Sequence, residues 1–221
     1  MADWIGIGRR ARRCYGFDEV ALCPGDKTIN PLEVDTSISI GGMKFTVPIV
    51  AAAMDGVVNV KLAVAMSKLG GIAVLNLDGV QTRYDDPEEI LEKIAHASAE
   101  EATSLIQGAY KLPIKEKLIA KRIREIKSQK GTAVVSCIPA NAERFSKIAV
   151  AAGADMFVIQ STVTTTKHIT TQYKTLDLHK FCKSCKIPVV LGNCVTYETT
   201  LDLMDTGAAA LLIGIGPGHA C

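Results

Sequence analysis

The residues GAAALLIGIGPGHAC (207–221) contain the pattern that decides the fold. The run 208–213 is short, apolar and bounded by glycine on both sides, which is typical of a fully buried strand in a parallel sheet. Three glycines follow it and permit a sharp turn and close approach of the backbone to a ligand: Gly214, Gly216 and Gly218. Cys221 stands three residues after the last of them. The pattern predicts a thiol at the carboxyl end of a buried strand.

Similar apolar runs alternate with helical patterns through the preceding part of the chain. Strands are expected at 48–53, 72–76, 132–137, 156–160 and 188–191. Helices are expected at 60–69, 87–96, 140–152, 176–185 and 198–205, and in two pieces within 100–130 that are interrupted near Pro113. Near-continuous apolar strands separated by helices predict a parallel sheet covered by helices.

Two parallel architectures compete, an open doubly wound sheet and a TIM (β/α)8 barrel. No G-x-G-x-x-G follows the first strand, and the even spacing of the units favours the barrel. A complete barrel needs eight strands and about 250 residues, so only about six of the eight βα units are present. We therefore expect the chain to be part of a longer protein. Residues 1–47, with a hairpin around Gly41 and Gly42, are expected to form an arm covering a partial barrel of residues 48–221.

Composition excludes several classes of protein. The 25 Lys and Arg residues nearly balance the 23 Asp and Glu residues, so neither a nucleic-acid nor a membrane partner is expected. No apolar run approaches the roughly 18 residues of a membrane helix, and we expect a cytoplasmic protein. The seven cysteines are odd in number and scattered, which indicates reduced thiols. Cys182 and Cys185 form a C-x-x-C that is interpreted as a helix end, because no second pair completes a metal site.

The functional site of a parallel α/β fold lies at the carboxyl ends of its strands. The side chains of Gln160 and Asn193 follow two such strands and offer amide groups to a heterocycle. Backbone amides of the glycine loop suit an anion. Asp55, after the first strand, either caps a turn or binds a ligand, and the sequence leaves both roles open.

Four motifs together resemble one family. YGFDEVALCPG (15–25), PIVAAAMDGV (48–57), VVLGNCVT (189–196) and above all the glycine loop ending in Cys221 resemble the IMP dehydrogenase/GMP reductase family, in particular its dehydrogenase-related branch without a CBS pair. The resemblance covers essentially the whole chain. It implies a purine nucleotide oxidoreductase on a (β/α)8 barrel, commonly a homotetramer. The reaction implied is NAD-dependent oxidation of IMP to XMP; NADPH-dependent reduction of GMP to IMP and ammonia, or nucleotide binding without catalysis, are the alternatives.

The resemblance also implies roles for single residues. Cys221 matches the nucleophile that adds to the purine C2. Met54, Gly218 and His219 match substrate-binding positions, and Gln160, Ser161, Asn193, Gly214 and Gly216 match cofactor-binding positions. The carbonyl groups of Gly216, Gly218 and Cys221 match those that hold a monovalent cation, usually potassium.

Departures from the family pattern concern the cofactor and the phosphate. Gln160 stands where the family commonly has an Asp facing the nicotinamide ribose, and His219 replaces a Ser. The choice between NAD and NADP therefore stays open. No long insertion is recognised between the second strand and its helix, where most IMP dehydrogenases carry the CBS pair. The flap with the water-activating base is not among the 221 residues, which alone are expected to be inactive.

Overall fold

The computed structural model describes residues 2–4, 10–12, 15–171 and 174–216, which divide into two compact units, Met1–Asp35 and Thr36–Cys221. The first unit contains an antiparallel pair of short strands, β1 (Ala2–Trp4) and β2 (Arg10–Arg12). Two 3-10 turns follow, η1 (Phe17–Glu19) and η2 (Pro31–Glu33). The sequence did not predict the β1–β2 pair, because three-residue strands are too short to show a period. Both turns lie within the arm that the sequence predicted at residues 1–47.

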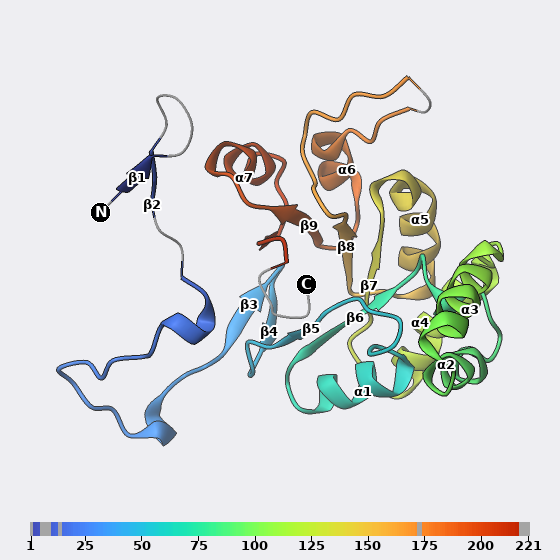
Figure 1. Ribbon diagram of the computed structural model, residues 1–221, viewed down its shortest axis with the longest axis horizontal. Helices are drawn as coiled ribbons and strands as arrows, with labels where there is room; N and C mark the ends of the chain where they lie inside the picture. The colour runs from blue at the N-terminus through green and yellow to red at the C-terminus, as the bar shows by residue number, and fades with distance from the viewer. Residues whose placement is uncertain (1, 5–9, 13–14, 172–173, 217–221) are drawn as a thin grey trace. The chain divides into compact units, whose positions relative to one another are not determined.

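The second unit is built on a six-stranded parallel sheet among the described residues (Figure 1). Its strands are β5 (Val50–Ala51), β6 (Ile72–Asn76), β7 (Val134–Cys137), β8 (Met156–Gln160), β9 (Val189–Cys194) and β10 (Ala210–Ile213). They lie side by side in the order of the chain, so the sheet has no point at which strand order reverses. A doubly wound sheet requires such a reversal. The predicted partial (β/α)8 barrel is confirmed.

Seven helices connect the strands of this described part of the chain. They are α1 (Val60–Lys68), α2 (Pro87–Ala95), α3 (Ala99–Lys111), α4 (Glu116–Ser128), α5 (Ala142–Ala152), α6 (Leu178–Ser184) and α7 (Tyr197–Met204). Two 3-10 turns, η3 (Val80–Thr82) and η4 (Pro139–Asn141), precede α2 and α5. Caps fix several ends: Asn59 accepts from the Leu62 amide, and Gly153 closes α5 with φ 92°.

Alternate residues of each strand enter two different cores. One set faces the helices and forms the outer core, which includes Leu75, Phe157 and Leu191, each fully buried. The other set, such as Val74 and Val158, forms an inner cluster on the concave side of the sheet. This two-residue alternation is the pattern of a strand buried on both faces.

A hairpin closes one end of the inner cluster. Its strands are β3 (Ile38–Ile40) and β4 (Met43–Phe45), and Phe45 is buried among the inner residues. At the turn, a Cβ on Gly41 would lie 2.3 Å from Pro188 Cβ, so only glycine permits this approach. The compact unit consequently begins at Thr36, whereas the sequence placed the boundary between residues 47 and 48.

Strand lengths also differ from expectation. β5 is confined to two residues, because it lies at the sheet edge and pairs only with β6 among the described strands. β9 instead runs through Gly192 and Asn193 to Cys194, residues that were expected in a loop. The longer β9 is held on both sides, by β8 and by β10.

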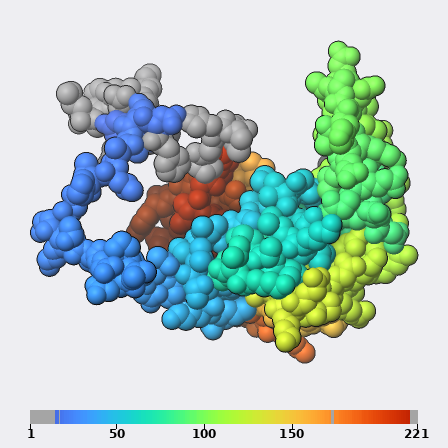
Figure 2. Space-filling model, turned by 90° about the horizontal axis from the view of Figure 1, so that it is seen from below, coloured from blue at the N-terminus to red at the C-terminus, as the bar shows by residue number. Residues whose placement is uncertain are grey.

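Helix α4 packs into the outer core through Ile119, Ile123 and Ile126, and its Leu118 is also buried. Helices α2 and α3 form an additional pair between β6 and α4, called here the α2–α3 hairpin. The sequence predicted both helices, at 87–96 and within 100–130, but not that they are additional to the barrel, because they have ordinary length and caps. Figure 2 shows its green segment projecting from the body of the unit. In the part of the chain described, no helix is long and apolar enough to cross a membrane.

Candidate active site at the carboxyl ends of the strands

A partly buried carboxyl group joins the exits of β6 and β7. Asp78 accepts hydrogen bonds from the Ile138 amide at 2.7 Å and from Asn141 Nδ2 at 2.6 Å. Burial raises the pKa of the Asp78 carboxyl group, against the lowering effect of these two donors and of Arg83 and Arg144. Asp78 therefore links the loop after β6 to the loop after β7 at the carboxyl ends of the strands.

A cavity of about 290 Å³ opens at the exits of β7 and β8. Ser161, predicted at a cofactor-binding position, lines it together with residues 138–140 and the loop that follows β8. Lys174 adds a cationic group to the lining, and His168 adds an imidazole ring. Sequence reasoning assigned neither residue a role; the available signal was the length and polarity of the loop after Gln160.

Ser161 and Asn193 are brought together by backbone hydrogen bonds. The Ser161 amide donates to Gly192 O and the Asn193 amide donates to Ser161 O, both at 3.0 Å. Thr164 then donates twice, from its amide to Asn193 O at 2.8 Å and from Oγ1 to Gly192 O at 2.6 Å. The cavity wall is thus fastened to the end of β9, and these two predicted residues lie side by side.

Asn193 has an unused acceptor. Its side-chain Oδ1 is buried and has no hydrogen-bond partner among the described residues. A buried carbonyl without a donor carries a free-energy cost that a ligand with an N–H or O–H group would remove.

A polar layer lies above the inner cluster. Asn76 and Ser136 are register partners on β6 and β7, and Gln160 pairs with Gly192. Because side chains alternate along each strand, these residues share the concave face with Val74, Val134 and Val158. Gln160 thus lies on the concave side of the sheet at the carboxyl end of β8, the edge where a barrel builds its site.

The glycine loop begins where β10 ends. The Gly214 amide donates to Cys194 O at 2.9 Å, which ties the start of the loop to the exit of β9. Gly214 and Gly216 have φ values of 111° and 56°, a region in which side-chain-bearing residues are strained. Gly218, His219 and Cys221 lie outside the described residues. The nucleophile, the phosphate-binding histidine and the three cation-binding carbonyls, of which only that of Gly216 is described, therefore stay predictions.

Met54 and Asp55 follow β5 in a short turn. The Met54 carbonyl accepts from the amides of Val57 and Val58, and its side chain is about half exposed. Asp55 Oδ2 accepts from the Val80 amide at 3.1 Å, and Oδ1 accepts from Asn76 Nδ2 at 3.3 Å. Of the two roles left open by the sequence, the structure shows that Asp55 binds protein groups, at the start of η3.

Two of the described thiols lie in the sheet. Cys137 and Cys194 are buried, and burial raises the pKa of Cys137 well above its ordinary value. Such a thiol carries little thiolate at neutral pH. Cys182 and Cys185 lie at the end of α6, as predicted. Across the described residues, no three His, Cys, Asp or Glu side chains converge as a metal site would require.

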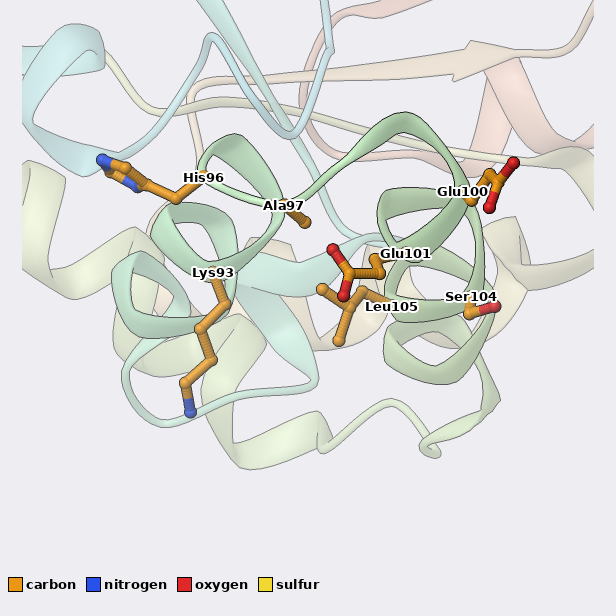
Figure 3. Close-up of a pocket in the computed structure, with 7 residues that line it drawn as sticks. All are labelled: Lys93, His96, Ala97, Glu100, Glu101, Ser104 and Leu105. Atoms are coloured by element: carbon orange, nitrogen blue, oxygen red, sulfur yellow. The ribbon is translucent and has the colours of Figure 1, made fainter.

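A larger cavity, about 790 Å³, lies between α2 and α3 (Figure 3). Lys93 and His96 extend in different directions, whereas Glu101 and Leu105 lie between the helices. Glu101 already accepts from Ser98 as part of the α3 cap, and Lys93 pairs with Glu89. Its polar groups serve the two helices, so the smaller cavity beside Ser161 is the candidate site.

Comparison with known proteins assigns this arrangement to a family. The model of the "IMP dehydrogenase / GMP reductase domain" matches residues 14–221. An uncharacterized oxidoreductase of Mycolicibacterium smegmatis is 32% identical over 96% of this chain and 58% of its own length. The inosine-5'-monophosphate dehydrogenase of Cryptosporidium parvum is 26% identical over 93% of this chain and 52% of its own.

A solved structure shows the same likeness. The crystal structure of an IMP dehydrogenase/GMP reductase-like protein from Corynebacterium glutamicum superposes with a TM-score of 0.88 at 31% identity, over 96% of this chain and 57% of that one. The chain thus spans little more than half the length of these relatives. The match of the family model from residue 14 to residue 221, over six parallel strands whose exits carry the site, shows that the chain belongs to the IMP dehydrogenase/GMP reductase family.

Proposed function

We propose that the protein is a purine nucleotide oxidoreductase of IMP dehydrogenase type, which oxidises IMP to XMP with NAD. The observation that carries the proposal is the cavity lined by Ser161, whose backbone is hydrogen-bonded to Asn193, a residue with a buried and unpartnered Oδ1, within a chain of this family. A cavity with polar groups at the carboxyl ends of the strands is the place where a ligand of this fold is expected to bind. The 290 Å³ cavity is near the lower limit of small-molecule pockets and matches part of a dinucleotide.

The proposed reaction uses a thiol bond to the purine. The Cys221 thiolate adds to C2 of IMP, and the hydrogen on C2 leaves as hydride. Water then adds to C2, the carbon–sulfur bond breaks, and XMP and the free thiol are released. Nicotinamide supplies the hydride acceptor when the dinucleotide is bound. Neither Cys137 nor Cys194 is proposed for this step, because both thiols are buried.

The chain's own residues would bind and orient the two ligands. Ser161 and Asn193 are assigned to the cofactor side, where Asn193 Oδ1 accepts a hydrogen bond from the ligand. Lys174, which lines the cavity together with His168, would attract the negative charge of the dinucleotide phosphates. Met54 is assigned to the face of the purine, and His219 to the phosphate of the nucleotide. The carbonyls of Gly216, Gly218 and Cys221 are proposed to hold potassium, and a cytoplasmic homotetramer is proposed from the family.

The test uses the full-length protein and its Cys221→Ala variant. Nicotinamide absorbance is followed with IMP plus NAD, and separately with GMP plus NADPH, each with and without potassium. Turnover of IMP that is lost in the variant supports the proposal. Turnover of GMP alone would replace it with GMP reduction. Calorimetric binding of both nucleotides without turnover in either assay would replace it with a non-catalytic binding role.

A further inference from the structure

The C-terminal end of α3 reaches back to the site face, although the α2–α3 hairpin adds little to either core. Only Pro87 in α2 and Ala109 in α3 are buried. Yet the Tyr110 hydroxyl, in the last turn of α3, donates to Asp55 Oδ2. The two residues are 55 positions apart in the chain, so this bond connects the insertion to the turn after β5.

Asp55 is the junction of four segments. Besides Tyr110, its carboxylate accepts from the Val80 amide at the start of η3 and from Asn76 at the end of β6. A Cβ on Gly79 would lie 1.9 Å from Asp55 Oδ1, so the carboxylate rests directly on the Gly79 backbone. This close seat leaves the carboxylate little freedom to move away from its donors.

The tyrosine is itself held in place. The Arg83 guanidinium lies 5.6 Å from the centre of the Tyr110 ring, and Arg83 also donates to Asp78 O and Leu112 O. Just beyond, the Lys115 amide donates to Thr82 O at 2.8 Å. Burial, and then the bond to Asp55, raise the pKa of Tyr110 far above its ordinary value. The phenol is therefore a hydrogen-bond donor throughout the neutral range.

The turn controlled by this junction carries a proposed substrate contact. Asp55 directly follows Met54, and the turn is anchored on its other side by Val58, which is buried in the outer core. With Val58 fixed by packing, the hydrogen bonds of Asp55 determine the remaining freedom of residues 54–57. Among the donors to Asp55, Tyr110 is the one that comes from the α2–α3 hairpin and not from a strand exit of the barrel.

We infer that Tyr110 is a positioning residue, which uses the Asp55 carboxylate to hold the Met54 turn in the conformation that receives the purine. The inference rests on the proposed function, because it assigns Met54 to the nucleotide. It gives the α2–α3 hairpin a role: an insertion that sets the affinity of the active site for its nucleotide. A shift of the hairpin would be transmitted to the turn through one hydroxyl group.

The test removes that hydroxyl group in the full-length protein. Tyr110→Phe keeps the ring beside Arg83 and deletes only the donor. Tyr84→Phe is the matched control, because it deletes a hydroxyl close to the same insertion that has no hydrogen-bond partner among the described residues. Asp55→Asn and the double variant Asp55→Asn/Tyr110→Phe complete a cycle, in which coupling appears as non-additivity.

The first readout is amide hydrogen exchange of the peptides covering residues 54–58 and 79–82. In Tyr110→Phe, exchange there is expected to accelerate about tenfold, the order expected for losing a hydrogen bond to a charged group. Exchange in β7 and β8 is expected to stay unchanged. The second readout is nucleotide binding and kinetics: KM and Kd for the nucleotide rise about tenfold while kcat changes little.

Three results would overturn the inference. They are equal behaviour of Tyr110→Phe and Tyr84→Phe, faster exchange with unchanged nucleotide affinity, and full additivity of the two substitutions in the cycle. Failure of the proposed function is a separate observation, namely absence of turnover in the unsubstituted protein. Amide exchange and calorimetric nucleotide binding still decide the role of Tyr110 in that event.

Discussion

Replacing Gly192 by alanine places a methyl group against β10. The new Cβ would lie 2.4 Å from Leu212 Cβ and 2.8 Å from Leu212 O. Carbon atoms in contact prefer about 3.5–4.0 Å, so β10 has to retreat by roughly 1 Å. The obstructing atoms belong to the backbone or lie next to it, and a rotamer change cannot relieve the clash. Overpacking of this kind costs about 1–3 kcal/mol of unfolding free energy.

The assay is thermal and urea unfolding of the full-length protein, with Gly108→Ala as control. Gly108 lies inside α3, and a Cβ added there would meet no atom within 4 Å, so the same chemical change is expected to stabilise that helix by about 0.5–1 kcal/mol. For Gly192→Ala the Tm is expected to fall by roughly 2–12 °C. A Gly192→Ala protein as stable as the unsubstituted one would refute the reasoning, because the β9–β10 contact would then be adjustable.

Three further predictions concern buried groups. Because burial raises the pKa of Asp78, protonation of this carboxyl group favours the folded state. In urea unfolding from about pH 4 to 8, the unsubstituted protein is expected to lose stability relative to Asp78→Asn as the pH rises through that raised pKa. A difference in stability that stays constant with pH would contradict this. Phe157→Ala empties a fully buried site against Phe181 and should lower the unfolding free energy by about 3–5 kcal/mol in the same assay. Arg122→Lys keeps the charge but loses the fork that donates to Gln81 O, Tyr84 O and Asp85 O, at a cost of about 2 kcal/mol; an unchanged urea midpoint would show that the fork is dispensable.

Most regular elements followed from local pattern. β8 coincides with the predicted strand 156–160, and α2 begins with Pro87 at its first position, as the sequence indicated. These elements have a clear apolar period or an end residue whose conformation is set locally. The β1–β2 pair and the start of the second unit at Thr36 did not follow, because they depend on pairing and packing with distant segments.

The site was predicted unevenly for the same reason. The proximity of Ser161 and Asn193 could be expected, since they lie at the carboxyl ends of adjacent strands of one sheet. The role of Asp55 could not, because its partners Val80 and Tyr110 reach it through an insertion that no local signal distinguishes from ordinary helices. His168 and Lys174 line the cavity only because their loop folds over the β7 exit.

The sequence by itself determined the alternation of strands and helices and the turn conformation of Gly214 and Gly216. Both follow from apolar periodicity and from φ preference, which act over a few residues. Tertiary structure alone decided which polar atoms meet. The unpartnered Oδ1 of Asn193 and the bond between Tyr110 and Asp55 depend on the path of the whole chain, which brings together groups that are far apart in sequence. Hydrogen bonding is short-ranged and directional, so such contacts exist only after the sheet and its insertion have been assembled.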